Sequence, residues 1–402
     1  MTKSSLQTPK GFRDFLPEQS SRRRFVVEKI RGILENFGFE PLETPTLEYA
    51  ELLKGKYGEE EKLIFEFTDR GGRDVALPYD RTVPLARVLA TNQNLSKPFK
   101  RYQIQASYRA DNPQKGRFRE FTQIDFDILG SNSLVADAEV IVASLAATKE
   151  VGFEKYILRV NDRKNFQGLP IEAIRAIDKL AKVGEYGVID QLKRVGYDTK
   201  EAKALLKRVK NSSPTKQVKD LFKLLENYKV ETDKYAFDPT LARGLDYYTG
   251  IVYEIEVEGY PAGSVGGGGR YDDLIGRFAN GKTPAVGFAF GLDRLIEAAE
   301  ELNLLDPYKV SSRVLVTVFN EKLLKESLSL VSLLRKQGVP AEISLDPNDK
   351  LEKQLKYADN KGIPYVAILG PEEVKTKTLT LKDLASGEQK NLKIGEVIRE
   401  IK

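Results

Sequence analysis

The order of strand-like and helical segments constrains the fold of this 402-residue chain more than any other feature. In its first part, alternating or clustered apolar residues predict strands at 62–69, 74–79, 101–109 and 119–130. Polar turns join the first two runs and the last two, and strands and helices do not alternate regularly as they do in parallel sheets. We therefore predict an α+β fold with a mostly antiparallel sheet in this part of the chain.

The sequence before these strands predicts a helix followed by extended chain. Residues 18–37 carry apolar side chains at helical spacing, and Gly38 follows at the position where a left-handed residue ends many helices. Residues 39–48 include Pro41 and Pro45, and the residue before a proline avoids the helical conformation. An amphipathic helix and then an extended segment are expected.

A Lys-rich helical segment interrupts the strand-like sequence. Between residues 179 and 230 there are 13 Lys and Arg against six Asp and Glu, whereas the net charge of the whole chain is only +5. Such an excess marks either a nucleic-acid surface or a solvated helix face, and charge alone leaves both open. Strand-like sequence returns at 251–257, before an expected Gly-rich turn at 263–269 and a strand-to-helix passage at 285–299.

The end of the chain predicts a separate small domain. Strand-like and helical segments alternate from 313 to 402, which is typical of an α/β domain with parallel strands. We expect residues 1–168 and 236–305 to form two parts of one domain. Residues 169–235 would be a helical insertion in it, and residues 313–402 a C-terminal domain.

The composition excludes many kinds of active site. The chain has no His, Cys or Trp, and Met1 is its single methionine. A His general base, a Cys/His zinc site and disulfides are therefore impossible. Any catalysis must use carboxylates, Lys, Arg, Tyr, hydroxyls, backbone dipoles or an oxygen-bound metal. No apolar run approaches the ~20 residues of a membrane span, and a cytoplasmic protein is expected.

Four arginines stand in apolar or Gly-rich contexts that are unusual for surface residues. Arg109 ends a predicted strand, Arg117 follows in a loop, and Arg243 and Arg294 lie beside glycines. The planar guanidinium donates several hydrogen bonds and keeps its charge, so it suits phosphate or carboxylate. Together they could clamp a polyphosphate, whereas each one alone could equally be an ion-pairing surface residue.

Two further patterns have both a functional and a structural interpretation. The glycines from Gly266 to Gly268, together with Gly287, either let the backbone approach a ligand closely or belong to a flexible hairpin tip and tight packing. The P-loop ending GK[ST] is missing from this run. Asp80 and Thr82 either hold a substrate ammonium group or cap the helix that follows them.

Taken in order, several segments resemble those of the histidyl-tRNA synthetases, which are class II aminoacyl-tRNA synthetases. The resemblance begins with GFRDFLP at 11–17, and FEPLETPTLE at 39–48 is similar to motif 1. Residues 108–130 resemble motif 2, and AVGFAFGLDR at 285–294 resembles motif 3. LARGLDYYTGIVYE at 241–254 and SVGGGGRYDDL at 264–274 resemble two signatures of the histidine enzymes.

The resemblance implies a fold, substrates and partners. It implies a catalytic domain with a mostly antiparallel six-stranded sheet, a helical insertion and an anticodon-binding α/β domain. The family enzymes are homodimers that use ATP, Mg²⁺, L-histidine and tRNA(His).

The resemblance also implies roles for individual residues. Arg109 and Arg243 would act at the α-phosphate and the reacting carboxylate, and Asp111, Arg117 and Arg294 would complete the ATP site. The histidine site would be formed by Asp80, Thr82, Gln123, Asp127, Tyr247, Tyr248 and Tyr271. No metal ligands are assigned.

Some features leave alternatives open. Pro78 and Arg81 replace the Arg and Leu of many relatives, and Arg81 would put a charge beside the ammonium site. A catalytically inactive regulatory relative, such as the regulatory subunit of ATP phosphoribosyltransferase, or a tRNA-binding module would not need all four arginines. The absence of His, Cys and Trp suggests a deliberately reduced alphabet, or a natural chain that spares histidine for its own synthesis.

Overall fold

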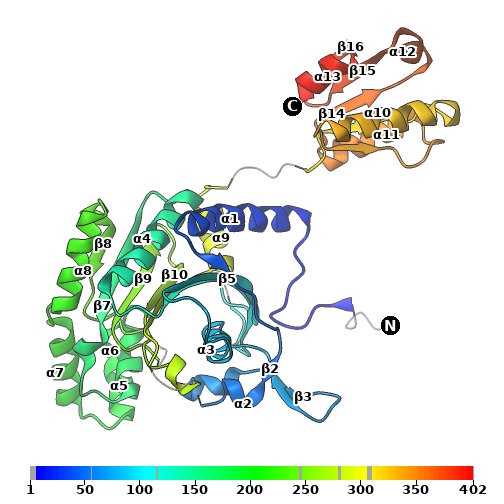
Figure 1. Cartoon of the computed structure of the whole chain (residues 1–402). Helices are drawn as coiled ribbons and strands as arrows, with labels where there is room; N and C mark the ends of the chain where they lie inside the picture. Colours follow the sequence, from blue (N-terminus) through cyan, green and yellow to red (C-terminus); the bar gives the residue numbers. More distant parts are fainter. Residues whose placement is uncertain are drawn as a thin grey trace. The chain divides into compact units, whose positions relative to one another are not determined.

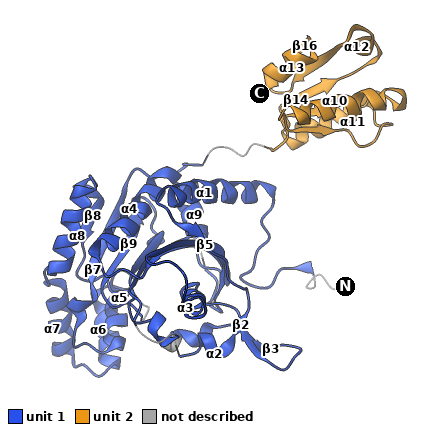
Figure 2. Ribbon diagram, viewed as in Figure 1, with its two compact units in different colours: residues 1–306 blue, residues 307–402 orange. Residues whose placement is uncertain are grey.

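The computed structural model describes residues 6–55, 57–114, 116–243, 247–278, 282–305 and 310–401. The chain divides into two compact units, Met1–Asp306 and Pro307–Lys402 (Figure 2). None of the helices in these ranges combines the length and the apolar character needed to cross a membrane.

A large mixed sheet is the centre of the first unit (Figure 1). Its strand order is β1-β5-β6-β11-β10-β9-β7-β8. The strands are β1 (Glu40–Pro41), β5 (Phe99–Tyr108), β6 (Glu120–Leu129), β7 (Tyr156–Asp162), β8 (Tyr235–Phe237), β9 (Ile251–Val257), β10 (Gly266–Arg270) and β11 (Ala285–Gly291). The six inner strands are antiparallel, as predicted, whereas β1 and β8 add short parallel edges that the sequence pattern did not indicate.

Three helices cover one face of this sheet: α1 (Pro17–Asn36), α4 (Leu134–Val151) and α9 (Leu292–Glu301). Alternate side chains of β6 and β11, among them Phe126, Phe288 and Phe290, pack against them. The predicted end of α1 is confirmed, because Gly38 has a φ of 76° directly after the helix. The opposite face curves around α3 (Thr82–Thr91) in Figure 1. Gln123, Asp125 and Asp127 of β6 lie on that face.

A small three-stranded sheet precedes α3. Its order is β2-β4-β3, with β2 at Glu48–Tyr49, β3 at Glu66–Thr68 and β4 at Asp74–Ala76. The predicted strands at 62–69 and 74–79 are therefore shorter than expected. The helix α2 (Ala50–Leu53) and the 3₁₀ helix η2 (Gly58–Leu63) occupy the chain between β2 and β3.

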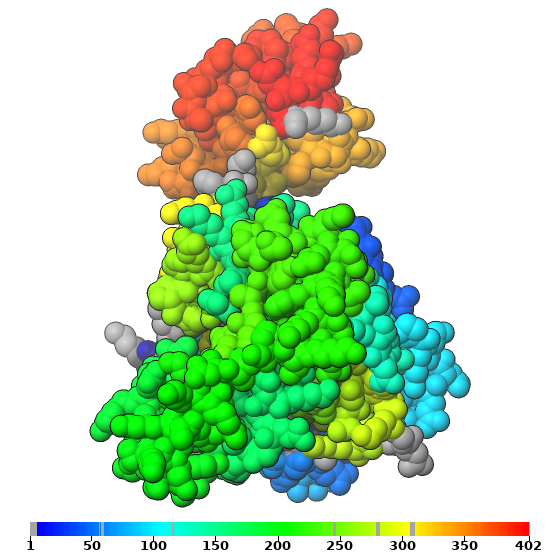
Figure 3. Space-filling view, turned by 90° about the vertical axis from the view of Figure 1, so that its left-hand side faces the viewer, coloured from blue at the N-terminus to red at the C-terminus, as the bar shows by residue number. Residues whose placement is uncertain are grey.

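The predicted helices of the Lys-rich segment are present. They are α5 (Ile171–Asp178), α6 (Leu180–Arg194), α7 (Thr199–Lys210) and α8 (Lys216–Asn227), with η3 (Arg163–Phe166) and η4 (Thr232–Lys234) at the two ends. Gly184 breaks α6 with a φ of 68°, and Asp198 begins α7 with a capping box. In Figure 3 this segment (green) forms much of the visible surface of the first unit.

The second unit contains a five-stranded sheet of order β13-β12-β14-β15-β16. Its elements are η6 (Glu321–Leu323), β12 (Val314–Val316), α10 (Leu324–Lys336), β13 (Ala341–Ile343), α11 (Leu351–Lys361), β14 (Tyr365–Ile368), α12 (Pro371–Thr376), β15 (Thr378–Asp383), β16 (Gln389–Lys393) and α13 (Ile394–Ile401). The first three strands are parallel, as predicted, but the antiparallel hairpin of β15 and β16 contradicts an all-parallel sheet. The sequence of β16 is mostly polar, in agreement with the exposure of this strand.

Candidate active site

The polar face of the large sheet is built by strict alternation along neighbouring strands. Gln123, Asp125 and Asp127 of β6 lie on this face, because successive side chains of a strand point to opposite sides. On β11 the residues paired with them are small: Gly291, Ala289 and Gly287. A row of carboxyl and amide groups therefore borders a floor of backbone, which leaves room for a ligand.

The glycine run forms the buried strand β10, so the predicted turn at 263–269 and the hairpin-tip interpretation are wrong. A Cβ atom on Gly268 would lie 2.0 Å from the carbonyl oxygen of Gly287, and one on Gly266 would lie 2.5 Å from the Phe288 ring. A Cβ atom on Gly267 would lie 2.6 Å from an Arg243 nitrogen. The missing side chains let β10 fit between its neighbours and make space for Arg243.

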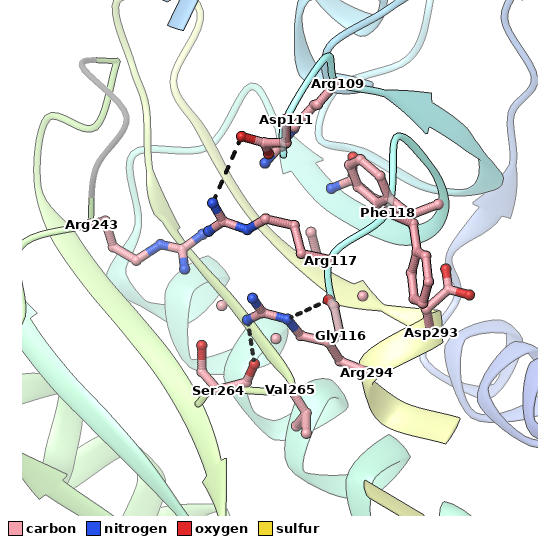
Figure 4. A pocket seen from close by; sticks show the side chains of 16 residues that line it. Arg109, Asp111, Gly116, Arg117, Phe118, Arg243, Ser264, Val265, Asp293 and Arg294 are labelled. Atoms are coloured by element: carbon pink, nitrogen blue, oxygen red, sulfur yellow. Dashed lines mark hydrogen bonds and ion pairs between the residues drawn. The ribbon is translucent and has the colours of Figure 1, made fainter. Parts of the chain in front are cut away.

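The first cavity, of about 240 Å³, is lined by all four of the predicted arginines and by Asp111. In Figure 4 the guanidinium groups of Arg117, Arg243 and Arg294 extend toward one another. Arg294 donates to the carbonyl oxygens of Gly116 (3.2 Å) and Ser264 (3.3 Å). The distance between Arg117 Nη1 and Asp111 Oδ1 is 3.8 Å.

The arginines of this cavity repel one another in the absence of an anion. Burial, followed by the nearby charge of Arg117, lowers the pKa of Arg294 from its usual value. Arg109 is fixed by a hydrogen bond from Nε to the backbone oxygen of Tyr79 (3.1 Å) and lies 4.1 Å above the centre of the Tyr79 ring. This cluster of cations suits a ligand with several negative charges.

Arg243 lies at the boundary with a second cavity. Its backbone has a φ of 55°, which is uncommon for a residue other than glycine, and its side chain pairs with Glu254 of β9. Residues 244–246 of the same sequence segment lie outside the described residues. Arg109, Gln123, Arg243, Gly267 and Ala289 line both cavities, so the two spaces adjoin.

The second cavity, of about 60 Å³, brings together the residues predicted to bind histidine. Its lining includes Asp80, Thr82, Gln123, Asp127, Tyr247, Tyr248 and Tyr271, together with Gly267, Gly268 and Gly287. The three tyrosines form an aromatic cluster, in which the ring centres of Tyr247 and Tyr248 are 4.9 Å apart and those of Tyr247 and Tyr271 5.8 Å. The cavity therefore combines carboxylates with flat aromatic walls.

Asp127 is a buried carboxylate held on two sides. Its Oδ2 lies 2.6 Å from Nη2 of Arg101, which is completely buried, and its Oδ1 accepts a hydrogen bond from the Tyr271 hydroxyl. Burial raises the pKa of Asp127, and Arg101 and Tyr271 oppose that rise. A Cβ atom on Gly287 would lie 1.8 Å from Asp127 Oδ1, so glycine is needed opposite this carboxylate.

Asp80 caps the helix that follows it and also lines the second cavity. Its Oδ1 accepts hydrogen bonds from the backbone N–H groups of Thr82 (3.0 Å) and Val83 (3.3 Å) at the start of α3. The same oxygen accepts from the Tyr57 hydroxyl (2.9 Å), and Oδ2 accepts from the Tyr247 hydroxyl (3.4 Å). The helix start fixes this carboxylate in place at the cavity wall.

Arg81 does not line the second cavity, but its charge acts on Asp125 and Asp80 in that lining, so a charge lies near the predicted ammonium site as expected. Arg81 Nη1 donates to the carbonyl oxygen of Pro45 (3.3 Å), and Nη2 donates to that of Ala106. Burial lowers the pKa of this guanidinium. Arg81 therefore connects the chain before β2 with β5.

Sequence reasoning missed several residues around the two cavities. They are Asp125 in the lining, Arg101 and Glu254 as ion-pair partners, and Tyr79 beneath Arg109. For Asp125 a signal existed, because it alternates with Gln123 and Asp127 along one strand. The partners could not be found in this way, because their contacts depend on strand register and on how loops pack.

Comparisons with known proteins show which family the chain resembles over almost its whole length. A sequence model of the histidyl-tRNA synthetase family matches residues 11–295, and one of an anticodon-binding domain matches residues 313–402. The chain is 38% identical to a histidine–tRNA ligase of Wolinella succinogenes, with 97% of each chain covered. It is 36% identical to that of Cytophaga hutchinsonii over the full length of both. The crystal structure of a histidyl-tRNA synthetase from Nostoc is similar with a TM-score of 0.83 at 30% identity, covering 98% of each chain.

Proposed function

Because the chain belongs to the histidyl-tRNA synthetase family, we propose that it attaches L-histidine to tRNA(His) through a histidyl-adenylate intermediate. ATP and histidine first give the adenylate and pyrophosphate. The histidyl group then passes to the 3′-terminal ribose of the tRNA, and AMP leaves. One observation carries the proposal: a cavity lined by four arginines adjoins a cavity lined by carboxylates and tyrosines.

Adenylation is chemistry that a site without histidine can perform. The carboxylate of the amino acid is already a nucleophile at neutral pH, so it needs placement against the α-phosphorus more than a general base. Arg109 and Arg243 line both cavities and would stabilise the negative charge where the two substrates meet. In the second step, an oxygen of the adenylate phosphate would accept the ribose proton.

The part of the first cavity that contains Arg117 and Arg294 would hold the β- and γ-phosphates. Arg117 and Arg294 would bind the γ-phosphate end, and Asp111 would orient Arg117. Among the described residues there is no group of three or more acidic side chains that could hold a metal ion. We therefore propose that Mg²⁺ is held mainly by the phosphates of ATP and not by a cage of protein ligands.

The second cavity would select histidine among the amino acids. Asp80, Thr82 and Gln123 would bind the ammonium group, and Asp127 and Tyr271 would bind a ring nitrogen, between Tyr247 and Tyr248. A neutral imidazole has one donor and one acceptor nitrogen, so buried polar partners reject side chains that cannot match them.

Two assays test the proposed function. Histidine should support ATP–pyrophosphate exchange, and of the amino acids offered in turn with purified tRNA, histidine should be the one transferred. A folded sample that binds ATP but shows no exchange would instead favour the regulatory or tRNA-binding alternative. The alternatives have no specific support here, because the relatives at 36–39% identity over almost the whole chain are histidine–tRNA ligases.

The partners follow from the family. We propose a cytoplasmic homodimer, whose residues 313–402 contact the anticodon of tRNA(His) and whose helical insertion at 169–235 contributes positive charge to tRNA binding. Sedimentation at micromolar concentration tests the dimer, and a monomer would refute it.

Gly287→Ala is expected to raise the KM for histidine more than tenfold and to leave the KM for ATP within about twofold. The added methyl group would overlap Asp127 Oδ1 and push this carboxylate away from Tyr271 and Arg101. Pyrophosphate exchange at varied histidine and ATP concentrations measures both constants. Gly395→Ala is the control, because its Cβ would meet nothing within 4 Å. Equal effects on both substrates would contradict a specific role of Gly287 beside Asp127.

A further inference from the structure

Asp125 is a buried carboxylate in the lining of the second cavity, and the proposed function gives it no role. It stands on β6 between Gln123 and Asp127, is 5% exposed, and lines the second cavity. Its Oδ1 accepts a hydrogen bond from Nε2 of Gln123 (3.4 Å), whereas its Oδ2 is buried without a hydrogen-bond partner among the described residues. Buried polar atoms are normally paired, so this one calls for an explanation.

The side-chain amide of Gln123 is the hydrogen-bond partner of Asp125. Gln123 Oε1 is also buried without a hydrogen-bond partner among the described residues, and Gln123 lines both cavities. An amide has a donor end and an acceptor end, whereas an ionised carboxylate can only accept. Asp125 therefore holds the NH₂ end of Gln123 and leaves its carbonyl oxygen as the free end.

We propose that Asp125 is a positioning residue, which keeps the carbonyl oxygen of Gln123 turned toward the ammonium group of the substrate. This inference rests on the proposed function, since it assumes that histidine occupies the second cavity. An ammonium group has three donors and no acceptor. It is therefore bound by the carbonyl end of Gln123 and repelled by the NH₂ end.

The charge state of Asp125 controls this orientation. Burial raises its pKa to about 7, and the acidic neighbours Asp127 and Asp80 act in the same direction, whereas Arg101 of β5 and Arg81 at the start of α3 oppose it. The paired residue on β11, Ala289, carries no charge, and Arg109 and Arg243 face the same cavity. Once protonated, Asp125 can donate to the Gln123 carbonyl, the amide can turn round, and binding of the ammonium group weakens.

Asp125→Asn tests this role, because it keeps the shape of the side chain but removes its titration. At about pH 8.5 the KM for histidine in ATP–pyrophosphate exchange should rise about tenfold, because the ammonium group loses one hydrogen bond. The kcat should stay within about twofold. At about pH 6 we expect Asp125 of the wild type to be mostly protonated, so the two KM values should converge. The titration of free histidine affects both proteins equally and cancels in their ratio.

A second substitution tests whether an acceptor at position 123 is what the Asp125→Asn variant lacks. In the double variant Asp125→Asn with Gln123→Glu, the carboxylate at 123 offers an acceptor in either orientation, so the KM at about pH 8.5 should recover most of the loss. Asp190→Asn, on an exposed carboxylate of α6, is the control and should change nothing. Asp125→Ser provides the same comparison if the Asn variant does not fold.

The outcomes separate this inference from the proposed function. An unchanged KM at about pH 8.5, a ratio that is the same at both pH values, or no recovery in the double variant would overturn the role of Asp125 while the wild type still shows exchange. A wild type without histidine-dependent exchange would overturn the proposed function, and the inference with it.

Discussion

Replacing Arg243 with Ala is expected to lower kcat/KM for histidine-dependent ATP–pyrophosphate exchange by about 10²- to 10³-fold, with the fold and ATP binding retained. Arg243 lines both cavities, so it lies where the carboxylate of histidine would meet the α-phosphate of ATP. Arg117 and Arg294 would remain to bind the other phosphates. The loss should therefore appear mainly in kcat, because the missing charge would stabilise the transition state.

Two controls separate catalysis from the loss of an ion pair. Arg159→Ala removes a similar pair from the same sheet, because Arg159 Nε lies 3.1 Å from Glu256 Oε2 between β7 and β9, outside both cavities. Its exchange rate should stay within about twofold of wild type, as expected for an exposed pair. The double variant Arg243→Ala with Glu254→Gln removes the carboxylate that Arg243→Ala leaves unpaired. If exchange is near normal in Arg243→Ala, or restored in the double variant, Arg243 has no direct role in adenylation.

Four of the six inner strands could be predicted from the sequence because they are long, whereas β7 and the helix α4 before it were not predicted. β5, β6, β9 and β11 are seven to ten residues long, so their period of two extends over several repeats. The edge strands β1 and β8 have two and three residues, too few for any periodicity. The β15–β16 hairpin was missed because β16 has little buried surface.

The glycine run shows how a local signal can mislead. Consecutive glycines favour a turn when they are considered alone, yet Gly266 to Gly269 pair with β9 and β11 over their whole length. Their small size is required by neighbours far away in the sequence, such as Phe288 and the Gly287 carbonyl. Local propensity was overridden by the packing of the sheet.

Residues that hold the cavity-lining side chains in place were also difficult to predict from the sequence. Asp127 and Tyr271 were named from the resemblance, whereas Arg101 was not, because its contact with Asp127 arises from the register of β5 against β6. The absence of His, Cys and Trp does not prevent the chain from forming this site. Its lining uses Arg, Asp, Gln, Tyr, Phe and small residues, so a chain without His can form it. The reduced-alphabet hypothesis stays open, and several natural close relatives with the same three absences would defeat it.

The largest effect on stability is expected for Arg101→Met. Arg101 is completely buried and its partner Asp127 is 6% exposed, so the substitution leaves a buried carboxylate without its counter-ion. Breaking a buried pair in this way typically costs about 3–5 kcal/mol of unfolding free energy. Asp125 would also lose the positive charge that Arg101 places near it. The KM for histidine should rise as well, because Arg101 holds Asp127 in place.

The pH dependence of this loss has a definite sign. Without Arg101, the pKa of Asp127 in the folded chain rises further above its value of about 3.9 in the unfolded chain. The unfolded state then gives up its proton more readily, so ionisation of Asp127 favours unfolding as the pH rises from about 4 through the folded pKa. The difference in Tm between wild type and variant should thus be large at about pH 8 and much smaller at about pH 5.

Calorimetry of the whole chain measures this difference, using the transition of the first unit because the two units need not unfold together. Arg159→Met is the matched control, and its exposed pair should be worth less than about 1 kcal/mol at either pH. Adding Asp127→Asn to Arg101→Met should recover much of the stability, since it removes the unpaired charge. If the loss is the same at both pH values and the double variant recovers nothing, the cost lies in packing around the Arg101 side chain. In that case the Arg101–Asp127 ion pair is not what stabilises the histidine cavity.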